Sequence, residues 1–282
     1  MHLGVTTFPT DYSMAPAELA TELEQRGFES LWVAEHSHIP SSRESPWPGG
    51  PDLPKMYYDV VDPFVALSMA AAVTSKLKLG TGIALVPQRD PMQLAKQVAS
   101  LDNLSGGRFL FGVGGGWNAE EMADHGTTDF KGRWKLMRER IEAMKALWTE
   151  DEPEYHGDLV DFDKCMVWPK PMQKPHPPVH VGGGFPHAVK RAIRYGDGWI
   201  PIGGRDGDLV AMAAEARALV AEAGRDAEAF EISIYAAPPK AEILQQYRDG
   251  GIDRAVFMLP PVSREESLPM LDKMSKAKDA LA

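Results

Sequence analysis

The amino-acid sequence predicts an α/β fold, a closed (β/α)8 TIM barrel with long loops at the C-terminal ends of its strands. Two observations carry this prediction. Short apolar runs alternate with longer amphipathic runs along the chain, and the 282 residues hold eight of the apolar runs. Strands that alternate with helices form parallel βαβ units, and eight units in a chain of this length suit a closed barrel. An open, doubly wound sheet is the alternative architecture.

The first half of the chain is predicted to supply four strands and four helices. Asp62-Pro63 and Asp90-Pro91 each mark a helix start, because Asp suits the N-cap and Pro the first helical turn. Gly27 and Gly106 suit the left-handed position after a helix. Strands are predicted at 2–8, 30–36, 78–83 and 108–113, and helices at 16–26, 62–74 and 132–149 and between Asp90 and Gly106.

The second half begins with a predicted hairpin and a proline-rich connector in the stretch YHGDLVDFDKCMVWPKP. Strands are then predicted at 179–181, 198–202, 230–236 and 254–259, and helices at 186–195, 207–223, 239–249 and 264–279. We expect one domain over residues 1–282. The segments 37–61 and 150–178 are the longest without helical pattern, and loops of that length typically cover a binding site.

Composition narrows the function classes. The formal net charge is −10 with no cluster of lysines and arginines, which argues against binding nucleic acid or an anionic membrane surface. Cys165 is the single cysteine, so an intramolecular disulfide cannot form. The N-terminal stretch lacks the pattern of a signal peptide, and no apolar run approaches the length of a membrane span. A cytoplasmic enzyme is expected.

Glycines gather where the predicted strands end, which is where barrels place their chemistry. Gly182, Gly183 and Gly184 precede a helix, a pattern that suits either a phosphate site or a tight turn. In the run GVGGGWNAEE, Asn118 and Glu121 have the spacing of a capping box, while the three glycines allow a ligand or another part of the chain to approach closely. The stretch GTGI at 80–83 has little side-chain bulk. It could let a flat ligand ring lie against the backbone, or its glycines could leave room for neighbouring side chains to pack.

The apolar strand LWVAEHSH ends in Glu35, His36 and His38. Two histidines two residues apart can hold a metal at a barrel strand end, but further ligands are needed, and apart from His180 the other strand ends offer glycine, isoleucine and proline. A single histidine that transfers a proton needs no further ligands beside it. His36 is therefore the candidate acid/base, and Glu35, on the opposite face of the strand, is a second catalytic candidate or an anchor for the neighbouring strand. No metal site is expected.

Four stretches together resemble the luciferase-like monooxygenase superfamily, and more closely its coenzyme F-420-dependent oxidoreductases: WVAEHSH, LKLGTGI, GRFLFGVGGGWNAEE and PVHVGGGFPHAVKRAIRYGDGW. The resemblance implies a barrel that is commonly dimeric, with F-420 or a flavin in its mouth. It implies that His36 gives or takes a proton beside the reactive ring, with Glu35 next to it. It also implies a cis peptide at Gly82-Ile83 that supports the ring. The implied cofactor-binding residues are Thr81, Gly82, Ile83, Gly115, Gly116, Trp117, Asn118, Gly182, Gly183, Gly184 and Phe185.

The expected function is hydride transfer between F-420 and a small organic substrate, in a homodimer. A lid at 37–61 would bring Trp47, Tyr57 and Tyr58 over the substrate. The charged tail of F-420 calls for cations, and the available ones are Lys131, Arg133, Arg138, Lys190, Arg191 and Arg194. Three alternatives stay open: an FMN-dependent monooxygenase served by a partner flavin reductase, a metal-dependent hydrolase built on His36 and His38, and a relative that binds a flavin without catalysis.

Overall fold

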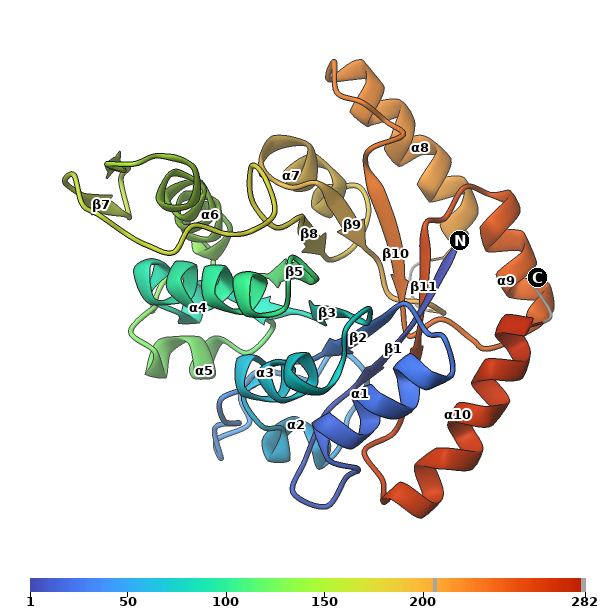
Figure 1. Cartoon of the computed structure of the whole chain (residues 1–282). Coiled ribbons are helices and arrows are strands. Elements are labelled where there is room, and N and C mark those ends of the chain that lie inside the picture. The colour runs from blue at the N-terminus through green and yellow to red at the C-terminus, as the bar shows by residue number, and fades with distance from the viewer. Residues whose placement is uncertain (205–206, 280–282) are drawn as a thin grey trace.

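Eight parallel strands close into a barrel in the computed structural model, which describes residues 1–204 and 207–279 (Figure 1). The strands follow the order β3, β2, β1, β11, β10, β9, β8 and β5, and the pairing of β3 with β5 closes the ring. The predicted barrel is therefore confirmed, and the open sheet is wrong. The barrel strands are β1 (His2–Thr7), β2 (Ser30–Val33), β3 (Lys78–Thr81), β5 (Phe109–Gly114), β8 (Val179–Gly182), β9 (Gly198–Ile200), β10 (Glu231–Tyr235) and β11 (Arg254–Met258).

Helices surround the barrel and shield the outer faces of its strands (Figure 1). Their starts follow the sequence signals: the Asp62 side chain accepts hydrogen bonds from the backbone N–H groups of Phe64 and Val65, and Asp90 accepts one from Gln93. Gly27, with φ of 69°, follows the first helix as predicted. The outer helices are α1 (Pro16–Gln25), α3 (Pro63–Val73), α4 (Pro91–Leu104), α6 (Arg133–Thr149), α7 (His187–Tyr195), α8 (Leu209–Glu222), α9 (Ala241–Asp249) and α10 (Arg264–Asp279).

Short elements decorate the face at the C-terminal strand ends, and the sequence did not predict most of them. The predicted strand at 78–83 is β3 followed by a separate short strand, which pairs with β5 beyond the Gly82–Ile83 peptide. The predicted strand at 30–36 ends at Val33, because the chain leaves the ladder at Ala34. The predicted hairpin is confirmed as an antiparallel pair. These elements are α2 (Met56–Asp59), β4 (Ala84–Leu85), η1 (Val86–Gln88), α5 (Ala119–Asp124), β6 (Tyr155–His156) and β7 (Asp161–Phe162).

The core has two layers. The larger layer lies between the strands and the helices, and a smaller cluster of Trp32, Leu110, Ile200 and Val256 fills the inside of the barrel. Trp32 needs the glycine of β3: a Cβ at Gly80 would lie 2.4 Å from the indole ring. Of the two explanations offered for GTGI, packing against a neighbouring side chain therefore accounts for the glycine at position 80.

An ion-pair cluster occupies the N-terminal end of the barrel, at the opposite end from the strand ends discussed above. Arg254 begins β11 and is fully buried. Its Nε and Nη2 donate to the two carboxylate oxygens of Glu29 at 2.8 and 2.9 Å, and its Nη1 donates to Glu231 and to Ser233 Oγ, each at 2.9 Å. A buried guanidinium needs such partners to offset its lost hydration, so this cluster holds the strands together at their first residues.

Candidate functional site

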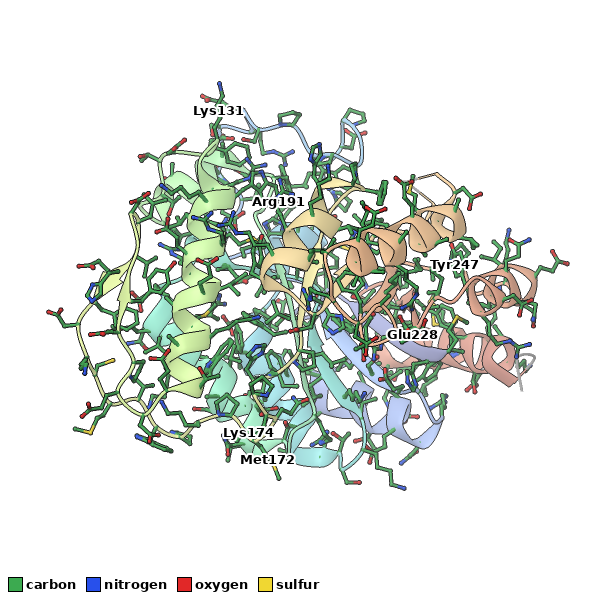
Figure 2. The ribbon with its side chains drawn as sticks, turned by 90° about the horizontal axis from the view of Figure 1, so that it is seen from above. Lys131, Met172, Lys174, Arg191, Glu228 and Tyr247 are labelled. Atoms are coloured by element: carbon green, nitrogen blue, oxygen red, sulfur yellow. The ribbon has the colours of Figure 1, made fainter. Side chains whose placement is uncertain are left out.

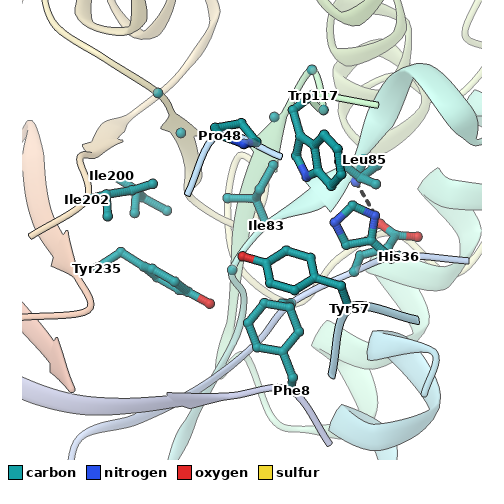
Figure 3. Close-up of a pocket in the computed structure, with 18 of the residues that line it drawn as sticks. Phe8, His36, Pro48, Tyr57, Ile83, Leu85, Trp117, Ile200, Ile202 and Tyr235 are labelled. Carbon is teal, nitrogen blue, oxygen red and sulfur yellow. Dashed lines mark hydrogen bonds between the residues drawn. The ribbon is translucent and has the colours of Figure 1, made fainter. Parts of the chain in front are cut away.

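A cavity of about 290 Å³ opens among the C-terminal ends of the barrel strands. Its wall is largely apolar, with His36 on one side and Tyr235 on the other side of Ile83 (Figure 3). The lining residues are Phe8, Ala34, Glu35, His36, Trp47, Pro48, Tyr57, Gly82, Ile83, Leu85, Gly114, Gly115, Gly116, Trp117, Trp134, Gly182, Gly183, Ile200, Ile202 and Tyr235. Nine of the thirteen catalytic and cofactor-binding candidates from the sequence are among them, together with Trp47 and Tyr57 of the predicted lid.

Ile83 lies at the centre of the cavity floor, after the Gly82–Ile83 peptide, which is cis as the resemblance implied. Its side chain occupies the space that two glycines leave open. A Cβ at Gly114 would lie 1.9 Å from Ile83 Cδ1, and a Cβ at Gly182 would lie 3.1 Å from Ile83 Cγ2. Glycines at the ends of β5 and β8 are therefore needed to seat the bulge that forms the floor.

His36 is held by a carboxylate that the sequence did not single out as functional. His36 Nδ1 lies 2.8 Å from Glu121 Oε2, and the backbone N–H of Ser37 donates to Glu121 Oε1 at 3.0 Å. Burial opposes the ionisation of Glu121, but the hydrogen bonds from His36 and Ser37 outweigh it and lower the pKa of Glu121. An ionised Glu121 places the proton of His36 on Nδ1, so Nε2 is the nitrogen left for the cavity.

Aromatic rings surround His36 and narrow the cavity. The Tyr57 and Trp117 ring centroids lie 5.4 and 5.7 Å from that of His36, and Trp47 lies 5.5 Å from Tyr57. Trp47 and Tyr57 both come from the 37–61 loop, as expected of a lid. Tyr58 does not join them: its side chain is 52% exposed and lies near Lys55. The turn of α2 points the two consecutive tyrosines in different directions.

Glu35 lines the cavity wall, but both oxygens of its carboxylate are taken up by hydrogen bonds to the chain that follows β3. Glu35 Oε2 accepts a hydrogen bond from the backbone N–H of Leu85 at 2.6 Å, and Oε1 accepts one from Arg89 Nε at 2.6 Å. These bonds anchor β4 and η1 beside the end of β2. The geometry matches the anchoring alternative drawn from the sequence.

Tyr235 provides a second polar group in the cavity. Thr6 Oγ1 donates to the Tyr235 hydroxyl oxygen at 2.7 Å, so the tyrosine proton is free to point elsewhere. Burial raises the pKa of Tyr235 far above its ordinary value, which keeps the hydroxyl neutral and able to donate. No sequence signal marked this residue, because one tyrosine in an apolar strand is also an ordinary core residue.

Four of the residues implied by the resemblance lie outside the cavity lining. Thr81 is fully buried and its hydroxyl donates to the Gly112 carbonyl. Asn118 caps α5 by accepting from the backbone N–H of Glu121, as the capping-box spacing predicted. Phe185 packs on Trp199 with ring centroids 5.9 Å apart. A Cβ at Gly184 would meet no atom within 4 Å, so the backbone there faces open space.

Two of the six predicted cations gather next to the glycine turns. The guanidinium carbons of Arg191 and Arg133 lie 3.6 and 4.6 Å from the centroid of Trp134, a cavity-lining residue that the sequence did not single out. Burial, together with the nearby Arg191, lowers the pKa of Arg133. Lys131 and Arg191 lie toward the same end of the molecule, away from Met172 and Lys174 (Figure 2).

The other predicted cations offer less positive charge to a ligand at the cavity. Arg138 lies 3.5 Å from Glu139 and Arg194 lies 4.0 Å from Glu142, so carboxylates take up their charge, and Lys190 is exposed.

His36 and His38 do not converge on a common point. His36 is turned inward to Glu121, whereas His38 is 40% exposed and its Nε2 lies 3.0 Å from Asp124 Oδ2. Residues two positions apart share a face only while a strand continues, and this strand ends at Val33. His180 is fully buried inside the barrel, and burial lowers its pKa to about 4. Within 1–204 and 207–279, no three histidine, cysteine or acidic side chains are grouped as metal ligands.

In the described part of the chain, no helix combines the length and apolar character that crossing a bilayer requires.

Comparison with known proteins places this site in context. Residues 11–250 match the luciferase-like monooxygenase family. An uncharacterised protein of Mycobacterium tuberculosis is 38% identical over 279 residues, covering 98% of both chains. The F420-dependent glucose-6-phosphate dehydrogenase of Amycolatopsis mediterranei is 31% identical over 202 residues, covering 68% of this chain and 54% of that protein. A monooxygenase of Streptomyces bottropensis has a similar fold, with a TM-score of 0.79 at 20% identity and 98% coverage of both chains.

Proposed function

The chain belongs to the luciferase-like monooxygenase family of oxidoreductases, and from that premise we propose that it transfers a hydride between coenzyme F-420 and a small organic substrate. His36 gives or takes the proton that accompanies the hydride. The observation that carries this proposal is the His36–Glu121 pair at the wall of an otherwise apolar cavity.

The His36–Glu121 pair is suited to acid/base work. A carboxylate on Nδ1 fixes the tautomer and the orientation of the imidazole, and it stabilises the imidazolium that forms when Nε2 takes a proton. The side chains of His36 and Glu121 are only 6% and 1% exposed, so bulk water does not compete for the proton. Nε2 can therefore exchange a proton with an alcohol or carbonyl oxygen in the cavity.

The residues around the cavity also fit a flat, phosphate-bearing cofactor. Ile83 and the side-chain-free ends of β5 and β8 form a floor against which a planar ring can lie. Gly184 leaves open space beside the start of α7, where backbone N–H groups favour an anion. When bound, F-420 supplies the hydride chemistry, while the protein supplies placement and the proton.

Support for F-420 rather than FMN comes from charge and from the relatives. Arg133 and Arg191 stack on Trp134, and neither forms an ion pair with a carboxylate in the described part of the chain. Uncompensated guanidinium groups in a chain of net charge −10 suit an anionic ligand such as the glutamate tail of F-420, which FMN lacks. The F420-dependent relative at 31% identity points the same way.

The cavity wall favours a small substrate of low polarity. Phe8, Trp47, Tyr57 and Trp117 supply aromatic surface, and no lysine or arginine is among the described lining residues. A phosphorylated sugar would therefore lack a cationic partner beside His36. We propose a small alcohol or carbonyl compound.

Titration of the purified protein with F-420 and, separately, with FMN tests the cofactor, followed by the change in ligand fluorescence. We expect F-420 to bind at least about tenfold more tightly than FMN, because FMN lacks the glutamate tail that the arginines would hold. Arg191→Ala should weaken F-420 binding and leave FMN binding nearly unchanged. Tighter binding of FMN would overturn the F-420 proposal.

The second candidate function is an FMN-dependent monooxygenase served by a flavin reductase. The observation that favours it is the fold similarity to a monooxygenase along nearly the whole chain. In that case His36 would protonate an oxygen-derived group, and oxygen uptake with a supplied flavin reductase would be the assay.

We also propose that the protein is a homodimer that pairs through α3. The inner face of α3 is buried through Phe64 and Leu67, yet its outer face exposes Val65, Met69 and Val73, at 61%, 46% and 48%. These three residues are four positions apart and form one line along the helix. A contiguous apolar stripe on a surface helix is typical of a protein–protein contact.

The substitution Met69→Glu is expected to convert the dimer to a monomer, as measured by size-exclusion chromatography with light scattering, because it places a charge in the apolar contact. Met270→Glu is the control, since Met270 on α10 is 37% exposed and lies outside the stripe. A wild-type monomer, or a dimer that survives Met69→Glu, would show that α3 is not the interface.

A further inference from the structure

A hydrogen-bonded chain leads from the His36–Glu121 pair to the protein surface. Glu121 Oε1, which accepts from the Ser37 backbone, also lies 3.5 Å from Ser37 Oγ. Ser37 Oγ lies 2.6 Å from His125 Nε2 and 2.9 Å from His38 Nδ1. Every step in this path is between groups that can both give and take a proton.

Burial changes along this chain from one end to the other. His36 and Glu121 are almost fully buried, whereas His38 is 40% exposed and its partner Asp124 is 61% exposed. Tyr57 and Trp117 lie against the His36 ring on the cavity side, and a bound cofactor and substrate would fill the remaining space there. Water then reaches His36 less easily from the cavity than through the chain behind it.

We propose, resting on the hydride-transfer function above, that Ser37 with His38 and His125 forms a proton relay that connects the His36–Glu121 pair to solvent. Each catalytic cycle of hydride transfer leaves one proton gained or lost at His36, and this proton must be exchanged with water before the next cycle. Imidazoles at the surface are suited to that exchange, because a neutral imidazole has one ring nitrogen that gives a proton and one that takes a proton.

Two short segments supply the whole relay. The end of β2 continues as His36, Ser37 and His38, which pass from the cavity wall to the surface. Asp124, the last residue of α5, and His125, which caps that helix, follow Glu121 by three and four residues, so these groups lie on one side of the helix. This arrangement gives a function to the second histidine of the EHSH stretch.

The proton moves as follows when the substrate is oxidised. His36 Nε2 takes the substrate proton, and the Nδ1 proton passes to Glu121 Oε2. A half-turn of the carboxyl group presents this proton to Ser37 Oγ, which gives its own proton to His125 or His38. The net change is one proton moved from the cavity to a surface imidazole. Glu121 is again ionised and Ser37 neutral, and His36 is neutral with its remaining proton on Nε2 instead of Nδ1. Reduction of the substrate runs the same path in reverse.

Glu120, the neighbouring acid on α5, is not part of the relay. Its carboxylate accepts from the Ser42 hydroxyl and from the backbone N–H groups of Glu44 and Ser45. It fastens the 37–61 loop to α5, and among the residues that the structure describes its hydrogen-bond partners belong to that loop and not to His36. Ser42 and Ser37 are therefore two serines that both bind a glutamate of α5, one outside the relay and one within it.

Exchange of the His36 Nδ1 proton with water tests the relay directly, by NMR of protein labelled with ¹⁵N-histidine, with and without bound F-420. We expect Ser37→Ala to slow this exchange about tenfold, the scale on which partners behind a catalytic group alter its chemistry. The Ser37 backbone N–H, and with it the bond to Glu121, is kept in this variant. Ser42→Ala is the matched control and should leave the exchange rate unchanged.

The variant His38→Ala/His125→Ala should slow the exchange similarly, and free imidazole should restore the rate because these positions border solvent. Free imidazole should not restore the exchange rate of Ser37→Ala, because the missing hydroxyl group lies inside the protein. An unchanged exchange rate in Ser37→Ala or in the double variant overturns the relay. The exchange is measured without a substrate, so the relay and the proposed function fail in different ways. If only the relay is wrong, F-420 still binds but the exchange rate no longer depends on Ser37. If only the proposed function is wrong, F-420 does not bind but the exchange rate still depends on Ser37.

Discussion

Replacing His36 with asparagine is expected to lower kcat about 10²–10⁴-fold, the usual contribution of a positioned acid or base. The asparagine amide can still donate to Glu121, so the carboxylate keeps a partner, but no group that takes a proton then faces the cavity. The measurement is the rate at which F-420 fluorescence disappears with the small alcohol that the wild-type enzyme oxidises. F-420 binding should change by less than about threefold, because His36 contributes little contact area compared with the rest of the cavity wall.

His156→Asn is the matched control for this experiment. His156 is an exposed histidine on β6 whose Nδ1 lies 2.7 Å from a carboxylate oxygen of Asp161, so it shares the histidine–carboxylate contact but is absent from the cavity. Its kcat should equal that of the wild type. Full turnover by His36→Asn with cofactor bound would remove the proton-transfer role from His36 and leave it a structural residue.

The barrel was predictable from the sequence because local signals and the global fold agree. Each apolar run is short enough to be a strand, and each helix has its own start, as at Asp62 and Asp90. The error at the end of β2 arises where that agreement fails. The apolar pattern predicts a strand as far as His36, but Glu35 and His36 are drawn out of the ladder by Leu85, Arg89 and Glu121.

The candidate site was predictable only in part, because its decisive contacts are remote in sequence. Glycines and His36 could be recognised from their place at strand ends. Glu121 has the spacing of a capping box with Asn118, and Asn118 does cap the helix. The Glu121 carboxylate, however, turns to a histidine 85 positions away. Tyr235 on β10 likewise reaches Thr6 on β1, past the strand β11 that lies between them, and no local pattern reports such a pairing.

The ion-pair cluster at the N-terminal end of the barrel gives the largest expected effect on stability. Arg254→Met is expected to lower the free energy of unfolding by about 3–5 kcal/mol, because it leaves the partly buried carboxylates of Glu29 and Glu231 without their main cation. Lys78, at 3.1 Å from Glu29 and 39% exposed, replaces only part of that charge. Urea unfolding followed by tryptophan fluorescence measures the change. Arg264→Met is the control, since Arg264 is 47% exposed and pairs with Glu22, and it should cost less than about 1 kcal/mol.

The pH dependence of this effect separates lost charge from lost packing. Burial alone would raise the pKa of Glu29, but Arg254 lowers it to about 2, below the ordinary 4.5. The stabilisation from this pair is therefore fully present above pH 4.5 and is lost as the pH falls toward 2. Without Arg254, burial raises the pKa of Glu29, so the variant gains stability as Glu29 is protonated. The difference between wild type and Arg254→Met should be largest near pH 7 and should shrink below pH 4. A difference that stays constant with pH would mean that the methionine only packs poorly and that the ion pair contributes little.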